Sequence, residues 1–249
     1  MTSDYEAIRI ENLHRYGTDG GVYGDMLLRD RYDDRTHFLF ELLQNAEDAY
    51  ARREDKPPQA SVRFTMFPTM LDVRHFGVEF TEHDVRGVCG IGQSTKDSQQ
   101  IGKFGIGFKS VYAYTERPEI HSGAEAFAIK DYVLPYACEP GPLAPRETSI
   151  RLPLRPDMPD ASDDILAALK GLGSPALLFL RRIEEISWGT DGAHSGHFLR
   201  EETNLDDLAS IVTLIGNDSE RPDDTDEEWL LFRRRVEGTE KELFVEVAF

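Results

Sequence analysis

The chain has 249 residues, 40% of them hydrophobic, and a formal net charge of −18 at pH 7. This length suffices for one large domain or two small ones, and the apolar content suffices for a real core. The acidity argues against a general nucleic-acid surface, which needs clustered Lys and Arg. No apolar run approaches the about 20 residues of a membrane-spanning helix, so no membrane partner is expected.

The two cysteines, Cys89 and Cys138, lie outside any C-x-x-C pair, so neither a disulfide framework nor a zinc site is expected. The first residues lack the basic start and apolar middle of a signal peptide. Together these features indicate a reducing compartment, and we expect a cytoplasmic protein.

The N-terminal part of the chain has helical patterns at residues 5–17 and 22–31, and a longer one at about 34–54 that Lys56-Pro57-Pro58 ends. Apolar residues recur along the long pattern at helical spacing, which predicts that they face the core. These residues are Phe38, Leu42, Leu43, Ala46, Ala49 and Tyr50.

Residues 60–67 and 70–76 alternate as two strands joined by Pro68-Thr69, which predicts a hairpin. Thr81 and Asp84 have the spacing of a capping box that opens a short helix. The polar, glycine-punctuated residues 90–101 are typical of a mobile lid.

The glycines of residues 102–107 come just before an apolar helical run. A glycine-rich turn at a helix N-terminus can bind phosphate through free backbone N–H groups. A tight packed turn is the alternative, because the segment fits neither the dinucleotide-binding nor the P-loop spacing.

Further strands are expected at residues 119–122, 124–131 and 148–154, interrupted by a proline-rich connection at 135–145. The prolines at 156 and 159 and the acidic run after them mark the best internal boundary. We therefore expect a domain over residues 1–156. Residues 157–249 are expected to extend that domain or to form a small appended α/β unit.

Beyond this boundary we expect a helix at residues 165–172, a passage from helix to strand at 176–188, and four strands. The strands are expected at 198–202, 209–215, 229–236 and 243–249. The acidic runs 160–164 and 218–228 are typical of solvated loops or helix starts. Since the sequence stops at Phe249 within an apolar alternation, we expect a fragment of a longer protein with further domains after it.

Glu41, Asn45 and Asp48 are spaced i, i+4 and i+7 on the long helix, so they share one stripe of it. An amide between two carboxylates on a mostly buried helix costs desolvation energy unless a ligand, a metal or a partner satisfies it. Alone, this stripe would be an ordinary polar helix edge.

The order of the motifs is more specific than any one of them. Glu41-x-x-x-Asn45 comes first, followed by His75-Phe-Gly77, the glycine segment and Thr148. This order resembles the GHKL ATPases, which comprise gyrase B, the large heat-shock chaperones, histidine kinases and MutL. The stretches HFLFELLQNAEDA and IGKFGIGFKSVY are most similar to the sacsin-like group. The resemblance covers about residues 30–155, and LLFLRRIEEISW at 177–188 is similar as well.

The resemblance implies an α+β fold of the Bergerat (GHKL) type. This is a two-layer sandwich in which a mixed, mainly antiparallel sheet carries helices on one face. It also implies two ligands, ATP and Mg²⁺, and a role for each motif.

By this resemblance Glu41 is the general base that activates water, and Asn45 is the metal ligand, which holds Mg²⁺ against the triphosphate. Asp48 matches the pocket edge, and Thr148 matches a threonine that holds adenine through water. The segment expected to wrap the phosphates comprises Gly102, Lys103, Phe104, Gly105, Ile106 and Gly107. The candidate phosphate cations are Lys103, Lys109 and, from the lid, Lys96.

Two positions of the first glycine box depart from the family pattern. The first glycine box usually reads D-x-G-x-G, but here His75 replaces the aspartate that accepts from the adenine amino group, and Glu79 replaces the second glycine. A neutral imidazole can still accept one hydrogen bond, so adenine selectivity is expected to be less secure than phosphate binding. Asp72 should point to the opposite face of the strand.

The leading function is a Mg²⁺-dependent ATP-binding and ATP-hydrolysing module of a larger protein, a chaperone-type or antiviral-defence machine. Family members work by lid closure and nucleotide-dependent homodimerisation. The alternative is a nucleotide-sensing or protein-interaction module with negligible hydrolysis. A histidine kinase is disfavoured for two reasons. The sequence shows no phospho-acceptor helix pair before the domain, and Glu41 is typical of the family members that hydrolyse ATP.

Overall fold

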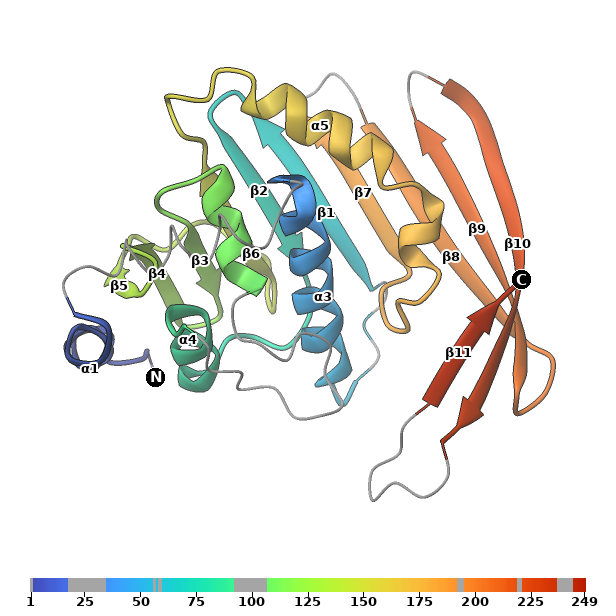
Figure 1. Cartoon of the computed structure of the whole chain (residues 1–249), viewed down its shortest axis with the longest axis horizontal. Helices are drawn as coiled ribbons and strands as arrows, with labels where there is room; N and C mark the ends of the chain where they lie inside the picture. The colour runs from blue at the N-terminus through green and yellow to red at the C-terminus, as the bar shows by residue number, and fades with distance from the viewer. Residues whose placement is uncertain are drawn as a thin grey trace.

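One eleven-stranded sheet runs through the protein (Figure 1), in the order β11-β10-β9-β8-β7-β1-β2-β6-β3-β4-β5. The computed structural model describes residues 2–17, 35–55, 57, 60–91, 107–191, 195–218, 221–236 and 244–249. Strands β1 and β7 pair in parallel. The other neighbouring strands pair antiparallel.

The strands form two groups that meet at β1 and β7. The first group is β1 (Ser61–Phe67), β2 (Met70–His75), β3 (Glu119–Ser122), β4 (Glu125–Lys130), β5 (Leu134–Ala137) and β6 (Thr148–Pro153). The second is β7 (Glu185–Thr190), β8 (Ser195–Asn204), β9 (Ala209–Asp218), β10 (Arg221–Arg235) and β11 (Phe244–Ala248).

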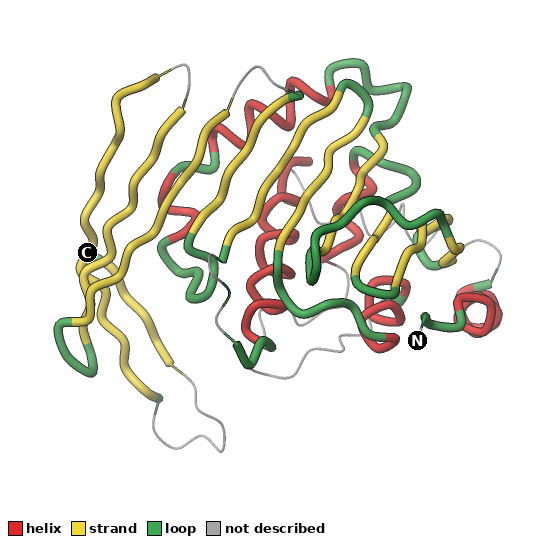
Figure 2. Tube along the Cα trace, turned by 180° about the vertical axis from the view of Figure 1, so that it is seen from behind, coloured by secondary structure: helices red, strands yellow, loops and turns green. Residues whose placement is uncertain are grey.

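The helices lie on one face of the sheet, except that α1 sits beside the β5 edge (Figure 1). They are α1 (Tyr5–Tyr16), η1 (Arg35–His37), α3 (Phe38–Ala51), α4 (Glu82–Cys89), η2 (Gly107–Ala113), α5 (Ala161–Gly171) and η3 (Ser174–Leu177). Figure 2 shows the opposite face, which carries no helix in the part of the chain that the structure describes. The expected α+β class, with a mixed and mainly antiparallel sheet covered on one face, is confirmed.

Helix α3 is the central helix of this layer and lies over β1 and β2 (Figure 1). The side chains predicted to face the core are all buried, at 4% exposure or less. Phe38 packs on Tyr114 with ring centroids 5.4 Å apart. The helix ends at Ala51, before the lysine and prolines expected to end it, because the N–H of Arg52 closes the last turn on the carbonyls of Asp48 and Tyr50.

Several local predictions hold in the structure. Residues 5–16 form α1, and the β1–β2 hairpin turns at Pro68-Thr69. The capping box is present, because the Thr81 N–H donates to Asp84 Oδ2 over 2.8 Å and the Asp84 N–H donates to Thr81 Oγ1. The acidic run at 160–164 starts α5.

Other predictions are wrong for identifiable reasons. The proline-rich connection contains β5, in which Pro135 pairs with Ile129 at the sheet edge, where a missing N–H is tolerated. The described residues of the acidic run, 218 and 221–228, lie in strands β9 and β10. Backbone pairing, which sets Asp226 opposite Ile215, outweighs the local preference of these acidic residues for loops. The helical run expected after the glycines is present, as a 3₁₀ helix over residues 107–113. The helix expected at 22–31 and most of the expected lid lie outside the described residues.

The expected boundary near residue 156 does not interrupt the sheet. Residues after it return as β7 and pair with β1, with Ser61 opposite Glu185. Residues 157–249 therefore continue the sheet that the first part of the chain begins. Within the described residues, we find no helix with the length and apolarity needed to cross a membrane.

Candidate functional site

The end of β2 is pressed against α3 at a glycine. A Cβ on Gly77 would lie 2.5 Å from the Cβ of Ala49, closer than a real Cβ can approach. The N–H of Val78 donates to the Ala49 carbonyl over 3.0 Å. Gly77 thus lets the segment after β2 touch the helix that carries Glu41, Asn45 and Asp48.

Glu41 lies against the last residue of the glycine-rich segment. A Cβ built on Gly107 would lie 1.9 Å from Glu41 Oε2. Gly107 begins η2, and its carbonyl accepts from the Ser110 hydroxyl over 2.7 Å, which holds the turn in place. The fold therefore brings together two of the motifs that the sequence places far apart.

The other oxygen of Glu41 meets a residue that the sequence analysis missed. His37, one turn earlier, places Nε2 3.5 Å from Glu41 Oε1. The Glu41 side chain is 16% exposed and that of His37 is 42% exposed. The i, i+4 spacing of a histidine and a glutamate could have predicted this pair.

Asn45 lies one turn after Glu41 and is partly buried, and Asp48 is buried. Amide and carboxylate oxygens are the ligands that hard divalent cations take in proteins. The oxygens of Asn45 and Asp48 therefore fit a hard divalent cation such as Mg²⁺, on the same helix as the Glu41 carboxylate that fills the space beside Gly107.

Thr148 and His75 face each other in register on β6 and β2, and Ser122 on β3 is the other neighbour of Thr148. The hydroxyls of Ser122 and Thr148 are 2.5 Å apart, and the N–H of Phe80 donates to Ser122 Oγ over 3.0 Å. Thr148 and His75, both expected to contact the base, are therefore neighbours on a buried floor. The sequence does not predict Ser122 as a site residue, because only the pairing of β3 with β6 places it beside Thr148.

His75 uses its acceptor within the protein. The N–H of Gly77 donates to His75 Nδ1 over 3.1 Å. The ring is 3% exposed, and burial lowers the pKa of His75 to about 4. The acceptor that the sequence analysis assigned to this imidazole is therefore already satisfied. Glu79, the second departure, lies over Gly123, where a Cβ would be 2.6 Å from Glu79 Oε2.

Asp72 points to the opposite face of the sheet from His75, as expected. It accepts from the Ser149 hydroxyl over 2.6 Å and from Arg74 Nε over 2.8 Å. Arg74 also pairs with Glu147. Asp72 therefore cannot substitute for the missing aspartate of the glycine box.

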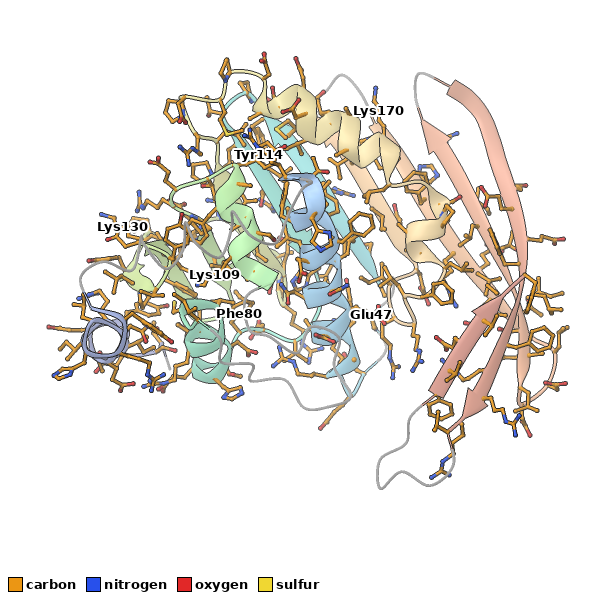
Figure 3. All side chains as sticks on the ribbon, in the orientation of Figure 1. Glu47, Phe80, Lys109, Tyr114, Lys130 and Lys170 are labelled. Carbon is orange, nitrogen blue, oxygen red and sulfur yellow. The ribbon has the colours of Figure 1, made fainter. Side chains whose placement is uncertain are left out.

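Lys109 is held by the backbone rather than extended toward a ligand. Its ammonium donates to the carbonyl of Val88, over 2.5 Å, and to that of Tyr132. The side chain lies between η2 and α4 (Figure 3), and burial lowers its pKa to about 8. Lys109 links the end of α4 to the turn before β5, and we leave it out of the proposed phosphate contacts.

The remaining expected phosphate contacts lie outside the described residues. They are Lys96, Gly102, Lys103, Phe104, Gly105 and Ile106. The described site therefore consists of the α3 stripe, Gly77, Gly107 and the floor formed by His75 and Thr148.

A buried carboxylate on α3 fixes the helix to the second half of the sheet. Glu47, labelled on α3 in Figure 3, accepts hydrogen bonds of 2.8 to 3.1 Å from the backbone N–H groups of Arg181, Arg182 and Ile183. Burial raises the pKa of Glu47, while the three donors favour its charged form. An acidic residue between core positions of a helix is the signal that could have found it.

Comparisons with known proteins agree with this picture. Residues 77–139, which include Gly77, Gly107 and Lys109, match the model of the Sacsin domain family. Protein NO VEIN of Arabidopsis thaliana is 34% identical over 122 residues, 46% of this chain and 4% of that protein. Sacsin of Homo sapiens is 32% identical over 125 residues, 43% of this chain and 3% of that protein.

A bacterial chaperone is more distantly similar over a longer stretch. Chaperone protein HtpG of Alcanivorax borkumensis is 26% identical over 172 residues, 56% of this chain and 28% of that protein. The chain thus spans only a small part of each of these relatives. Taken together, the family match and the relatives show that this chain carries a sacsin-like domain of the GHKL class.

Proposed function

We propose that this domain is a Mg²⁺-dependent ATP-binding and ATP-hydrolysing module with a Bergerat-type pocket, working within a larger protein. The observation that carries the proposal is the contact between the Glu41 carboxylate and Gly107. A carboxylate directly beside a phosphate-binding glycine segment is well placed to orient and deprotonate the water that attacks a phosphoanhydride.

Each described residue has a separate task in this proposal. Glu41, held between His37 and Gly107, orients a water and accepts its proton. Asn45 offers its amide oxygen to Mg²⁺, which when bound neutralises charge on the phosphate oxygens. Gly107 contributes backbone at the phosphate end, and Thr148 with Ser122 forms the floor at the base end.

The relatives support the wider context. HtpG is named as a chaperone, and the chain covers small fractions of NO VEIN and sacsin. We therefore place the module in a larger chaperone-type machine. The proposed cycle uses lid closure over the nucleotide and dimerisation of the ATP-bound state.

The hydrogen bond that His75 accepts within the protein supports a second candidate function. A site whose base-reading acceptor is already satisfied favours a nucleotide-sensing or interaction module with negligible hydrolysis. A nucleotide-sensing module would share ATP binding with the first function and lack its turnover, whereas an interaction module would bind ATP weakly.

Two variants test the proposal. Glu41→Ala should lower ATP hydrolysis by about 10²–10⁴-fold, the contribution of a general base, while ATP binding stays intact. Asn45→Ala should weaken triphosphate binding much more than adenosine binding, and only in the presence of Mg²⁺. Calorimetry with Mg²⁺ or a chelator, beside steady-state turnover, measures both effects.

The outcomes separate the two functions. If wild type and Glu41→Ala bind ATP and turn over equally slowly, the sensing module is supported. If affinity is the same with chelator as with Mg²⁺, the assignment of Asn45 is contradicted. Accumulation of an ATP-bound dimer in Glu41→Ala, measured by light scattering, would support the proposed cycle.

A further inference from the structure

We infer that His75 presents a hydrogen-bond donor, not an acceptor, to the base, so the pocket takes a 6-oxopurine nucleotide such as GTP or ITP in preference to ATP. This inference rests on the proposed nucleotide-binding function. It concerns the position of the glycine box at which the family's base-reading aspartate is replaced by His75.

The tautomer of His75 follows from its surroundings. The N–H of Gly77 donates to Nδ1 over 3.1 Å, so Nδ1 must carry a lone pair. Gly77 cannot move away easily, since it is packed against Ala49 and the next residue, Val78, is bonded to the Ala49 carbonyl. The donor that fixes the tautomer is therefore rigid backbone.

The ring is also neutral at physiological pH. It is 3% exposed, and burial lowers its pKa to about 4. A neutral imidazole with a lone pair on Nδ1 carries its single proton on Nε2. Nε2 is consequently a donor and cannot accept from an exocyclic amino group.

Two hydroxyl groups beside the ring, those of Tyr50 and Thr148, make their hydrogen bonds elsewhere. The Tyr50 hydroxyl, whose ring centroid lies 6.1 Å from that of His75, donates to the Ser61 carbonyl and accepts from the N–H groups of Phe76 and Ser61. The Thr148 hydroxyl, across the strand pair, is hydrogen-bonded to Ser122 and makes no hydrogen bond to His75. Among the described residues we find no acceptor bonded to His75 Nε2, so the proton remains available to a ligand.

The class of base then follows from hydrogen-bond polarity. Adenine has an amino donor at position 6, which would meet the Nε2 proton as a second donor. Guanine and hypoxanthine have a carbonyl acceptor at that position. A buried donor that faces another donor is left unsatisfied, and sites built on such contacts discriminate strongly between analogues.

The sharpest comparison is ATP against ITP, which differ only at position 6 and in the proton on the adjacent ring nitrogen. We expect wild type to bind Mg·ITP at least about tenfold more tightly than Mg·ATP, and GTP to follow ITP if the pocket has room for its 2-amino group. His75→Asp restores the family's acceptor and should reverse the order to favour ATP. His75→Asn can present either polarity and should discriminate least.

A second measurement needs no nucleotide and uses a variant only to assign the His75 signal. Long-range ¹H–¹⁵N spectra of the whole chain report which imidazole nitrogen carries the proton, and His75, assigned by its loss in His75→Asn, should be the Nε2–H tautomer. An Nδ1–H tautomer, or tighter binding of ATP than of ITP by wild type, would overturn the inference alone. Failure to bind any of the three triphosphates would instead overturn the proposed function.

Discussion

Glu41 Oε2 occupies the space in which any residue other than glycine at position 107 would carry its first side-chain carbon. The built Cβ of Gly107 would lie 1.9 Å from that oxygen and 2.7 Å from the carboxyl carbon. The carboxylate is therefore positioned by the glycine as well as by its own helix. Substitutions at Gly107 and at the neighbours of Glu41 should therefore change the rate of hydrolysis.

Gly107→Ala should displace the Glu41 carboxylate, because the carboxylate ends a flexible side chain and can yield more easily than backbone. A misplacement of about 1 Å costs about 10²-fold in rate, so we expect hydrolysis to fall by about that factor while the melting temperature changes little. The matched control is Gly171→Ala, whose Cβ meets no atom within 4 Å. Full activity in Gly107→Ala would show that the carboxylate works elsewhere.

His37→Ala should lower turnover several-fold and leave the Kd for Mg·ATP unchanged, because His37 contacts Glu41 Oε1 and no proposed nucleotide contact. The decisive variant carries both His37→Ala and Glu41→Gln. If His37 acts through Glu41, the double variant should be no slower than Glu41→Gln alone. The exposed His83 of α4 provides the surface control.

Lys109→Met should destabilise the fold and spare nucleotide affinity. The substitution leaves the buried carbonyls of Val88 and Tyr132 without their donor, at a cost of about 2 kcal/mol. Urea denaturation measures this loss, and Lys130→Met, at an exposed lysine, is the comparison. Unchanged stability with a large loss of ATP affinity would return Lys109 to the phosphate site.

His75 should make the protein less stable in mild acid. Its folded pKa of about 4 lies below the usual 6.5, so between these values the unfolded chain binds a proton that the folded protein does not. Stability therefore falls as the pH decreases through this window, by about 2 kcal/mol between pH 7.5 and pH 5. Denaturant titrations at the two pH values measure the loss.

The corresponding control is His75→Asn, which cannot titrate at this position. It should lose about 2 kcal/mol less than wild type over the same pH interval. An equal loss in both proteins would assign the acid sensitivity to other groups.

Local periodicity was enough to predict the elements whose pattern is set by one buried face. The buried side of α3, the β1–β2 hairpin and the capping box at Thr81 all follow from residues close together in sequence. It failed at β5 and at the acidic half of β10, where a neighbouring strand decides the conformation. Pairing supplies backbone hydrogen bonds that outweigh weak local preferences.

The candidate site likewise contains residues that the sequence predicts and residues that only the three-dimensional structure reveals. The stripe on α3 and the place of Thr148 could be predicted, because helix spacing and motif order specify them. The contact of His37 with Glu41 and the pairing of Ser122 with Thr148 depend on how segments meet in space. The tautomer of His75 depends on a backbone N–H two residues away, which no pattern of side chains reveals.

The parallel pairing of β1 with β7 has a practical consequence for dissecting the protein. A chain ended near residue 156 would keep Glu41, Asn45, His75 and Thr148, yet it would turn β1 into an open sheet edge. Unpaired N–H and C=O groups along such an edge are a template for association with other chains. Glu47 would also lose the three donors that satisfy its buried carboxylate. Insolubility of such a piece would therefore report a broken sheet, and it would carry no information about nucleotide binding.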